Sequence, residues 1–245
     1  SAASDVYKRQ LANNFWPAFG NTLFFTLVTV LLETILGIGM ALVMAKDFHG
    51  RGLLRAAVLV PWAIPTAITA KLWAFLFSEQ GIVNSIFHAH VAWQTDPWAA
   101  RFSIILADVW KTTPFMALLI LAGLQMIPKD LYEAARMDGA NAWQRFTRIT
   151  LPLAKNSIIV AVLFRMLDAL RMYDLPYIMV GPNPDSPTAT LSQLVVAAIR
   201  QDHVNAASAL STLIFLLIFL IALCFVKSLG SKVAHQAEPV VAEEE

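Results

Sequence analysis

The sequence has few charged residues and almost no cysteine. Only 14% of its 245 residues are charged and 58% are hydrophobic, whereas about 25% of residues are charged in a typical soluble domain. This composition excludes an ordinary soluble domain and indicates a membrane protein. The one cysteine, Cys224, lies in an apolar run, so an internal disulfide is excluded. A net charge of +1 gives no reason to expect a nucleic-acid partner.

The sequence also lacks the usual signatures of enzymes. None of its ten glycines is followed by lysine, so there is no G-x-x-x-x-G-K-[ST] loop to hold nucleotide phosphates. There is no G-x-S-x-G motif, no H-E-x-x-H motif and no Cys/His cluster. His88 and His90 have no third ligand nearby in the sequence. We therefore expect no enzyme, no metal site and no cofactor bound by this chain.

Long apolar segments are what the sequence does have. A helix needs about 20 mainly apolar residues to cross about 30 Å of hydrocarbon. Five segments qualify, roughly 22–45, 53–77, 102–124, 157–180 and 206–226. The sequence thus predicts an all-α, polytopic helical bundle, with a shorter interfacial helix at 191–200. The expected organisation is an external segment (1–20), a membrane domain (21–230) and a disordered cytoplasmic tail (231–245).

Positive charges distinguish the two ends of the expected spans. Ten Lys and Arg residues lie in or beside the connections 46–55 and 128–155 and in the C-terminal tail, whereas four lie on the opposite side. Positively charged short loops remain in the cytoplasm. We therefore expect a cytoplasmic C-terminus, a cytoplasmic 128–155 connection and an external N-terminus.

Several ionisable residues lie within the spans, where they must face protein or water because charge is costly in lipid. For Glu33, a packing hydrogen bond is at least as reasonable a role as substrate contact. Asp108 and Lys111 are three residues apart, so each can neutralise the other. In the fourth span, charges of alternating sign recur every third residue, at Arg165, Asp168, Arg171 and Asp174. Asp108, Lys111 and this ladder are candidates for lining a substrate pathway. The alternative for the ladder is a set of salt bridges that holds the spans together.

The connection 128–152 is the most polar stretch between spans. Asp130 and Glu133 have the spacing of a capping box, and Gly139 can adopt the left-handed backbone that ends a helix. Asn141, with a glutamine three residues later, repeats the start signal. We expect a compact helix–turn–helix, which we call the knob (residues 128–152).

Prolines are expected to interrupt two helices. Pro61 and Pro65 should bend the second span, either to line a cavity or as a packing kink. Pro152 should mark the turn from the knob back towards the bilayer.

The knob resembles the EAA loop of binding-protein-dependent ABC importer permeases. The matching positions are Glu133-Ala134-Ala135, Gly139 after three further residues, Ile149 after nine more, and Leu151-Pro152. The resemblance implies the type I ABC importer permease fold and a coupling helix that docks into a groove of a cytoplasmic ATPase. It assigns charge pairing to Glu133, close packing to Ala134 and Ala135, a bend to Gly139, and rim contacts to Arg136 and Asp138.

Three further stretches, 110–115, 138–140 and 165–181, resemble maltose- and trehalose-type carbohydrate permeases. This resemblance implies ATP-driven import of a sugar such as trehalose or maltose across the cytoplasmic (inner) membrane. The implied partners are a second homologous permease (as a heterodimer), an ATPase dimer that binds ATP and Mg²⁺, and an external or lipid-anchored binding protein. Family members usually have six spans, so five spans with an external start would correspond to a chain without the first span.

Other functions remain open at this point. Permeases for amino acids, peptides and phosphate share the EAA loop. An ion-coupled secondary transporter would suit the ladder, but such transporters often have repeated halves, which are not apparent in this sequence. A structural membrane subunit would leave the EAA spacing unexplained.

Overall fold

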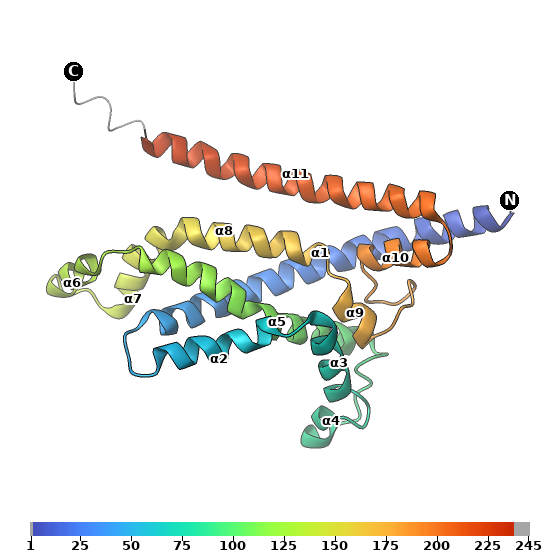
Figure 1. Cartoon of the computed structure of the whole chain (residues 1–245), viewed down its shortest axis with the longest axis horizontal. Coiled ribbons are helices and arrows are strands. Elements are labelled where there is room, and N and C mark those ends of the chain that lie inside the picture. Colours follow the sequence, from blue (N-terminus) through green and yellow to red (C-terminus); the bar gives the residue numbers. More distant parts are fainter. Residues whose placement is uncertain (1, 238–245) are drawn as a thin grey trace.

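The computed structural model describes the backbone of residues 2–237 and the side chains of residues 13–225 and 227. This part of the chain is helical and contains no strand (Figure 1). The elements in chain order are α1 (Ala2–Ala45), α2 (Arg51–Ala63), α3 (Thr66–Leu76), α4 (Ile82–Phe87), α5 (Pro97–Gln125), α6 (Lys129–Met137), α7 (Ala142–Arg145), the π-helical η1 (Phe146–Thr150), α8 (Leu151–Ala169), α9 (Asp174–Met179), α10 (Leu191–Arg200) and α11 (Val204–Ala237).

Helices occupy parts of both expected terminal segments. Most of the expected external segment 1–20 belongs to α1, which is continuous from Ala2 to Ala45. Helix α11 continues to Ala237, so the first residues of the expected disordered tail are helical. Residues 238–245 of that tail lie outside the described residues. The expected short helix at 191–200 is confirmed as α10.

Four helical stretches within the described residues are long and apolar enough to span a membrane, namely Asn13–Ala45, Pro97–Gln125, Ala142–Ala169 and Val204–Phe225. Helices α2 and α3 together make a fifth, but they meet at an angle of 87°. The prediction of about five spans is confirmed if this broken pair counts as one span.

The break between α2 and α3 comes from one of the two prolines. Pro65 caps α3, and Ile64 before it has an extended backbone with ψ 132°, as expected because the residue before a proline avoids the helical region. Pro61, by contrast, remains inside α2. The second expected span is therefore two helices rather than one bent helix.

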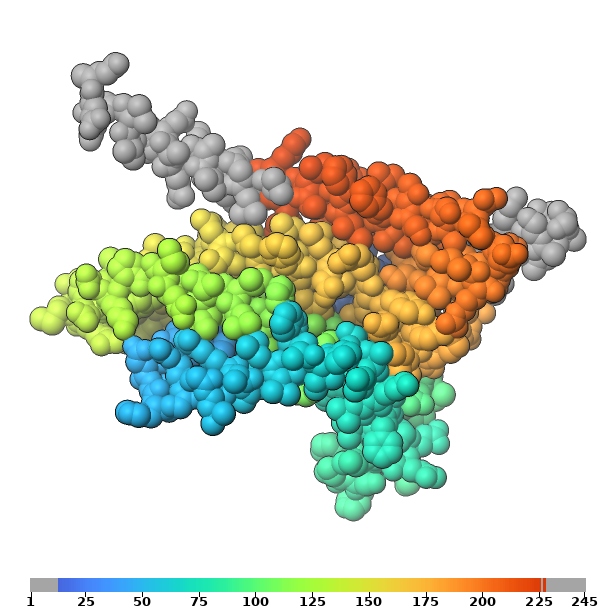
Figure 2. Space-filling view, viewed as in Figure 1, coloured from blue at the N-terminus to red at the C-terminus, as the bar shows by residue number. Residues whose placement is uncertain are grey.

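Helix α5 is the centre of the bundle. Its most extensive contact is with α1, and it also packs against α8 and α2. Small residues at these contacts, including Ala41, Ala117 and Ala161, are fully buried and allow the helices to approach closely. A Cβ at Gly123 of α5 would collide with the side chain of Ser157 on α8. Helix α11 lies apart from this core, along the upper face of the bundle in Figure 2.

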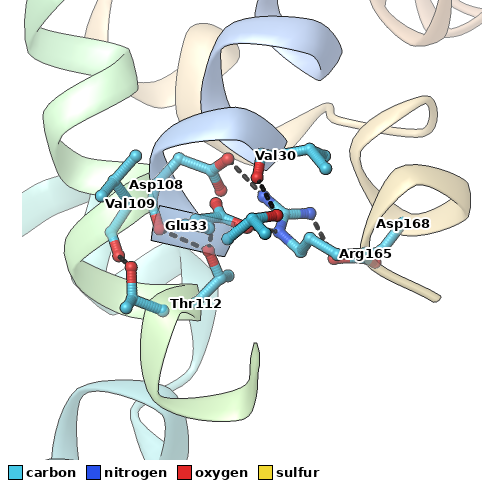
Figure 3. Close-up of polar contacts among 9 residues, drawn as sticks. Val30, Glu33, Asp108, Val109, Thr112, Arg165 and Asp168 are labelled. Atoms are coloured by element: carbon cyan, nitrogen blue, oxygen red, sulfur yellow. Dashed lines mark hydrogen bonds and ion pairs between the residues drawn. The ribbon is translucent and has the colours of Figure 1, made fainter. Parts of the chain in front are cut away.

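A buried arginine joins three helices inside the bundle (Figure 3). Arg165 of α8 is 2% exposed, and its Nε donates a hydrogen bond to Oε2 of Glu33 on α1 at 2.5 Å. Its Nη2 pairs with Asp108 on α5, and its Nη1 lies 3.0 Å from Oδ2 of Asp168. The hydroxyl of Thr112 lies 2.6 Å from the other oxygen of Glu33. We call these five residues the buried arginine cluster. The packing role considered for Glu33 is thus confirmed.

The expected ladder of charges along one helix is wrong beyond its first pair. Helix α8 ends at Ala169, Arg171 lies exposed in the following turn, and Asp174 begins α9. Only Arg165 and Asp168 form an ion pair within the ladder. The other partners of the arginine come from α1 and α5, which no spacing within α8 could indicate.

Asp108 and Lys111 attract each other as expected, but they do not form a direct ion pair. Nζ of Lys111 instead donates hydrogen bonds to the carbonyl oxygens of Ile64, at 2.5 Å, and Trp62, at 3.3 Å. These carbonyls lie at the end of α2, where Pro65 leaves them without helical partners. Lys111 therefore stabilises the break between α2 and α3.

Replacing the buried arginine should destabilise the bundle. Arg165→Met leaves the carboxylates of Glu33 and Asp108 without their cation, and loss of one partner from a buried ion pair costs about 3–5 kcal/mol. We expect a clearly lower thermal unfolding temperature for the detergent-solubilised protein. Arg171→Met, which removes the same charge from an exposed site, is the matched control. Equal unfolding temperatures for the two variants would contradict the assignment.

Candidate functional site

A cavity of about 310 Å³ adjoins the buried arginine cluster, where α2, α5 and α8 meet the turn before α9. We call it the polar cavity. All six residues predicted to line a substrate pathway do line it, namely Asp108, Lys111, Arg165, Asp168, Arg171 and Asp174. The structure therefore brings them together although they do not share a helical face. Three are acidic and three are basic, so the lining has no excess charge.

Aromatic and hydroxyl side chains that the sequence analysis missed complete the polar cavity. Trp62, Thr66 and Tyr173 also line it. Trp62 is stacked on Phe115 with ring centroids 5.5 Å apart, and Tyr173 is stacked on Tyr177 at 4.9 Å. Trp62 and Thr66 flank the break at Pro65, so the expectation that a bent helix lines a cavity was the signal that could have found them.

The chemistry of the polar cavity suits a polar ligand. Its carboxylates accept hydrogen bonds, whereas Lys111 and the arginines only donate them. The aromatic rings add flat apolar surfaces. Of the cluster residues, Asp168 has a side chain that is 64% exposed, whereas Glu33 is fully buried. Asp168 is thus available to a ligand, while Glu33 serves packing.

At one end of the bundle the knob projects from the helices (Figure 2). Its first helix, α6, starts after Pro128 without a side-chain cap, so the capping role expected of Asp130 is wrong. The turn expected at Gly139 is confirmed, since this residue has φ 78°. The amide of Ala140 donates to the carbonyl of Ala135 at 2.9 Å and closes the turn.

The second helix of the knob starts as predicted but does not end as predicted. Asn141 and Gln144 form a capping box, with reciprocal bonds of 2.9 and 2.8 Å between side chains and backbone amides. Helix α7 then continues through η1 into α8 without a turn. Pro152 lies within the first two residues of α8, where a missing backbone donor is tolerated once the preceding turn widens to a π-helix. The turn expected at Pro152 is therefore wrong.

The residues expected to contact an ATPase are mostly exposed. The exposed ones are Glu133, Ala134, Arg136, Asp138, Gly139, Leu151 and Pro152, and the half-buried ones are Ala135 and Ile149. Large apolar side chains are exposed beside them, with Met137 88%, Met126 83% and Trp143 70% exposed. Apolar groups gathered on an otherwise polar projection indicate a contact surface.

Ion pairs hold the knob against the connection between α1 and α2. Nζ of Lys129 lies 2.9 Å from Oδ2 of Asp47, which also pairs with Arg51. The hydrogen bond from Lys129 holds the pKa of Asp47 below its usual value. Tyr132 lies three residues after Lys129 on α6, and its hydroxyl is 3.0 Å from the hydroxyl of Thr150.

Comparison with known proteins identifies the family. Residues 33–235 match the model of the binding-protein-dependent transport system inner membrane component. The trehalose/maltose transport system permease protein MalF of Thermococcus litoralis is 44% identical over 88% of this chain and 75% of its own length. The trehalose transport system permease protein SugA of Mycobacterium tuberculosis is 39% identical over 89% of this chain and 71% of its own length.

Solved structures agree with this assignment. A chain of a bacterial ABC transporter involved in import of the acidic polysaccharide alginate has a TM-score of 0.80 at 25% identity, over 88% of this chain and 78% of its own. A chain of the MetNI methionine ABC transporter shares the fold, with a TM-score of 0.66 at 19% identity over 90% of this chain and 95% of its own. The predicted permease fold is thereby confirmed. The chain belongs to the family of binding-protein-dependent transport system inner membrane components, the multi-pass permeases of ABC importers.

Proposed function

We propose that this permease translocates a neutral sugar through the polar cavity. The observation that carries the proposal is the lining, which combines equal numbers of acidic and basic side chains with the rings of Trp62 and Tyr173. Sugars bind through hydrogen bonds and through aromatic faces, and a lining without excess charge disfavours an acidic ligand. The names of the two similar permeases support trehalose or maltose as the first candidates.

Three partners are expected for this permease, and the knob indicates the first, a cytoplasmic ATPase. The knob's exposed apolar side chains and Glu133 form the surface proposed to dock into a cytoplasmic ATPase dimer, which binds the ATP and Mg²⁺. A similar alginate transporter was solved with a bound periplasmic protein, which supports delivery of the ligand by an external binding protein. Exposed leucines and phenylalanines on α11 need lipid or a second permease against them. We expect this second permease to be a homologous chain.

The arrangement of the helix ends supports a cytoplasmic knob and C-terminus. The connection between α1 and α2, the knob and the C-terminal part of α11 lie at the same end of the bundle (Figure 1). This is the end to which the sequence assigns ten basic residues, in agreement with the rule that cytoplasmic loops are positively charged.

One continuous helical stretch connects the ATPase surface to the polar cavity. Helices α7, η1 and α8 run without interruption from Ala142 to Ala169, which corresponds to roughly 40 Å at 1.5 Å per residue. Arg165 and Asp168 lie near the far end of this stretch. A displacement of the knob by the ATPase is therefore transmitted as a rigid movement of one wall of the cavity.

The ion-coupled alternative loses its basis. It rested on a continuous ladder of charges in the fourth span, and the structure instead pairs Arg165 with carboxylates on α1 and α5. An amino-acid, peptide or phosphate permease would use the same knob, so the solute must be tested directly.

Removal of the carboxylate at the knob should uncouple the ATPase. In the reconstituted importer, Glu133→Ala should lower ligand-stimulated ATP hydrolysis by roughly tenfold or more. Loss of a charge pair at the interface costs about 1.4 kcal/mol or more of binding free energy, which corresponds to that factor. Glu79→Ala, which removes an exposed glutamate beyond the end of α3, should leave hydrolysis unchanged. Equal activities in the two variants would show that the knob does not couple.

Truncation of the exposed tryptophan in the polar cavity should weaken sugar uptake. We expect Trp62→Ala to raise the KM for trehalose by roughly fivefold, since an aromatic contact contributes about 1 kcal/mol. Trp98→Ala, at a 70% exposed position outside the polar cavity, is the matched control. The measurement is uptake of labelled trehalose into proteoliposomes, with maltose and an alginate oligosaccharide as competitors. Efficient competition by the acidic oligosaccharide alone would contradict a neutral ligand.

A further inference from the structure

A second cavity, of about 930 Å³, lies at the end of the bundle that carries the knob. We call it the basic cavity. Its walls come from the end of α1, the start of α2, the end of α5 and helix α6. Five basic residues line it, namely Lys46, Arg51, Arg55, Lys129 and Arg136, against the two acidic residues Asp47 and Glu133. The lining therefore carries an excess of positive charge, in contrast to the polar cavity.

Arg55 has hydrogen-bonding capacity that the described residues do not use. Its Nη2 donates to the carbonyl oxygen of Met44 at 2.7 Å, which fixes the guanidinium beside the end of α1. Its Nε is buried and has no acceptor among the described residues, and no acidic side chain there pairs with it. A buried N–H group without an acceptor is costly, so the guanidinium favours an additional acceptor in the cavity.

The acidic residues leave several of the positive charges uncompensated. Asp47 is shared between Arg51 and Lys129, so one carboxylate serves two cations. Among the described residues, Lys46 and Arg136 have no ion-pair partner. Positively charged groups from two walls thus face the same space.

One wall of the basic cavity is apolar. Leu42, Leu124 and Ile127 line it, next to the point where the spanning helix α1 ends at Ala45. At this level of a membrane protein, an anionic headgroup can meet the basic residues while its acyl chain lies along the apolar side chains. Cavities of about 300–1,000 Å³ are of the size that binds small ligands.

We propose that the basic cavity binds a phosphate-bearing anion, and its apolar wall favours an anionic phospholipid as the source. Phosphate oxygens accept the forked hydrogen bonds that arginine offers. Basic pockets between spanning helices bind lipid headgroups in the same way. Bound phosphate joins α2 to α6 through Arg51 and Arg55 on one side and Lys129 and Arg136 on the other. The proposal goes beyond sugar transport and holds whatever solute the polar cavity carries.

The test is lipid binding to the assembled importer, measured by native mass spectrometry with phosphatidylglycerol and phosphatidylcholine as probes. The pocket variant is Lys46→Gln with Arg51→Gln, which retains the contact between Arg55 and Met44. The control is Lys155→Gln with Lys227→Gln, which removes the same charge from exposed residues outside the basic cavity. We expect phosphatidylglycerol to bind roughly 10- to 30-fold more weakly to the pocket variant, and with unchanged affinity to the control.

A second pocket variant tests the opposite wall. Lys129→Gln with Arg136→Gln should weaken phosphatidylglycerol binding to a similar degree. Phosphatidylcholine should bind to all of the variants with the same affinity. A parallel arm measures protection of the importer from thermal unfolding by inorganic phosphate. Protection that is lost in both pocket variants, without selective lipid binding, would identify a soluble phosphate as the source. The proposal would be overturned if pocket and control variants bound phosphatidylglycerol with equal affinity and were equally protected by inorganic phosphate.

Discussion

The structure depends on the ion pairs of Arg165. A guanidinium in the interior of a membrane protein is stable only if its charge and its N–H groups are satisfied. Three carboxylates meet this requirement, and two of them come from helices α1 and α5, far away in the sequence. The relative positions of α1, α5 and α8 are therefore fixed by electrostatics as well as by the close contacts of small residues such as Ala117 and Ala161.

The same ions that hold the bundle also form a wall of the polar cavity. Glu33 on α1 is fully buried. The carboxylate of Asp168, one turn after Arg165 on α8, is largely exposed. Of the two roles considered for the charged residues from the sequence, the internal salt bridges are present, whereas lining of a substrate pathway by residues such as Asp168 stays a proposal. Any movement of α8 that changes the cavity must also disturb these pairs, which links the state of the cavity to the packing of the bundle.

Local signals in the sequence were sufficient where the structure is local. Apolar runs located the spans, Gly139 ended α6, and Asn141 with its glutamine started α7, because each of these features depends on neighbours within a few residues. The prediction that Asp130 caps α6 was wrong because the N-cap position is occupied by Pro128. The prediction of a turn at Pro152 was wrong because the π-helical segment before it accommodates the proline within a continuous helix.

Tertiary contacts determine the features that the sequence did not predict, such as the end of α8 and the partners of Lys111. No glycine or proline marks the end of α8 at Ala169. The turn is held instead by Thr190, whose hydroxyl donates to the carbonyl oxygen of Met172 at 2.9 Å. Lys111 likewise found its acceptors at the broken end of α2, 47 and 49 residues away. Such partners cannot be derived from spacing along one helix. The six candidate residues do line one cavity, but their role in a substrate pathway stays a prediction, and most of their pairings could not be predicted.

The most direct test of the account is the accessibility of the polar cavity when the ATPase acts. A chain carrying Asp168→Cys and Cys224→Ser would be labelled from the external side with a membrane-impermeant thiol reagent, with and without ATP trapped on the partner. The account predicts that trapped ATP accelerates labelling, and that adding Glu133→Ala at the knob abolishes this acceleration. Acceleration that persists in the Glu133→Ala chain, or labelling that is independent of ATP, would contradict the claim that α7, η1 and α8 couple the knob to the cavity.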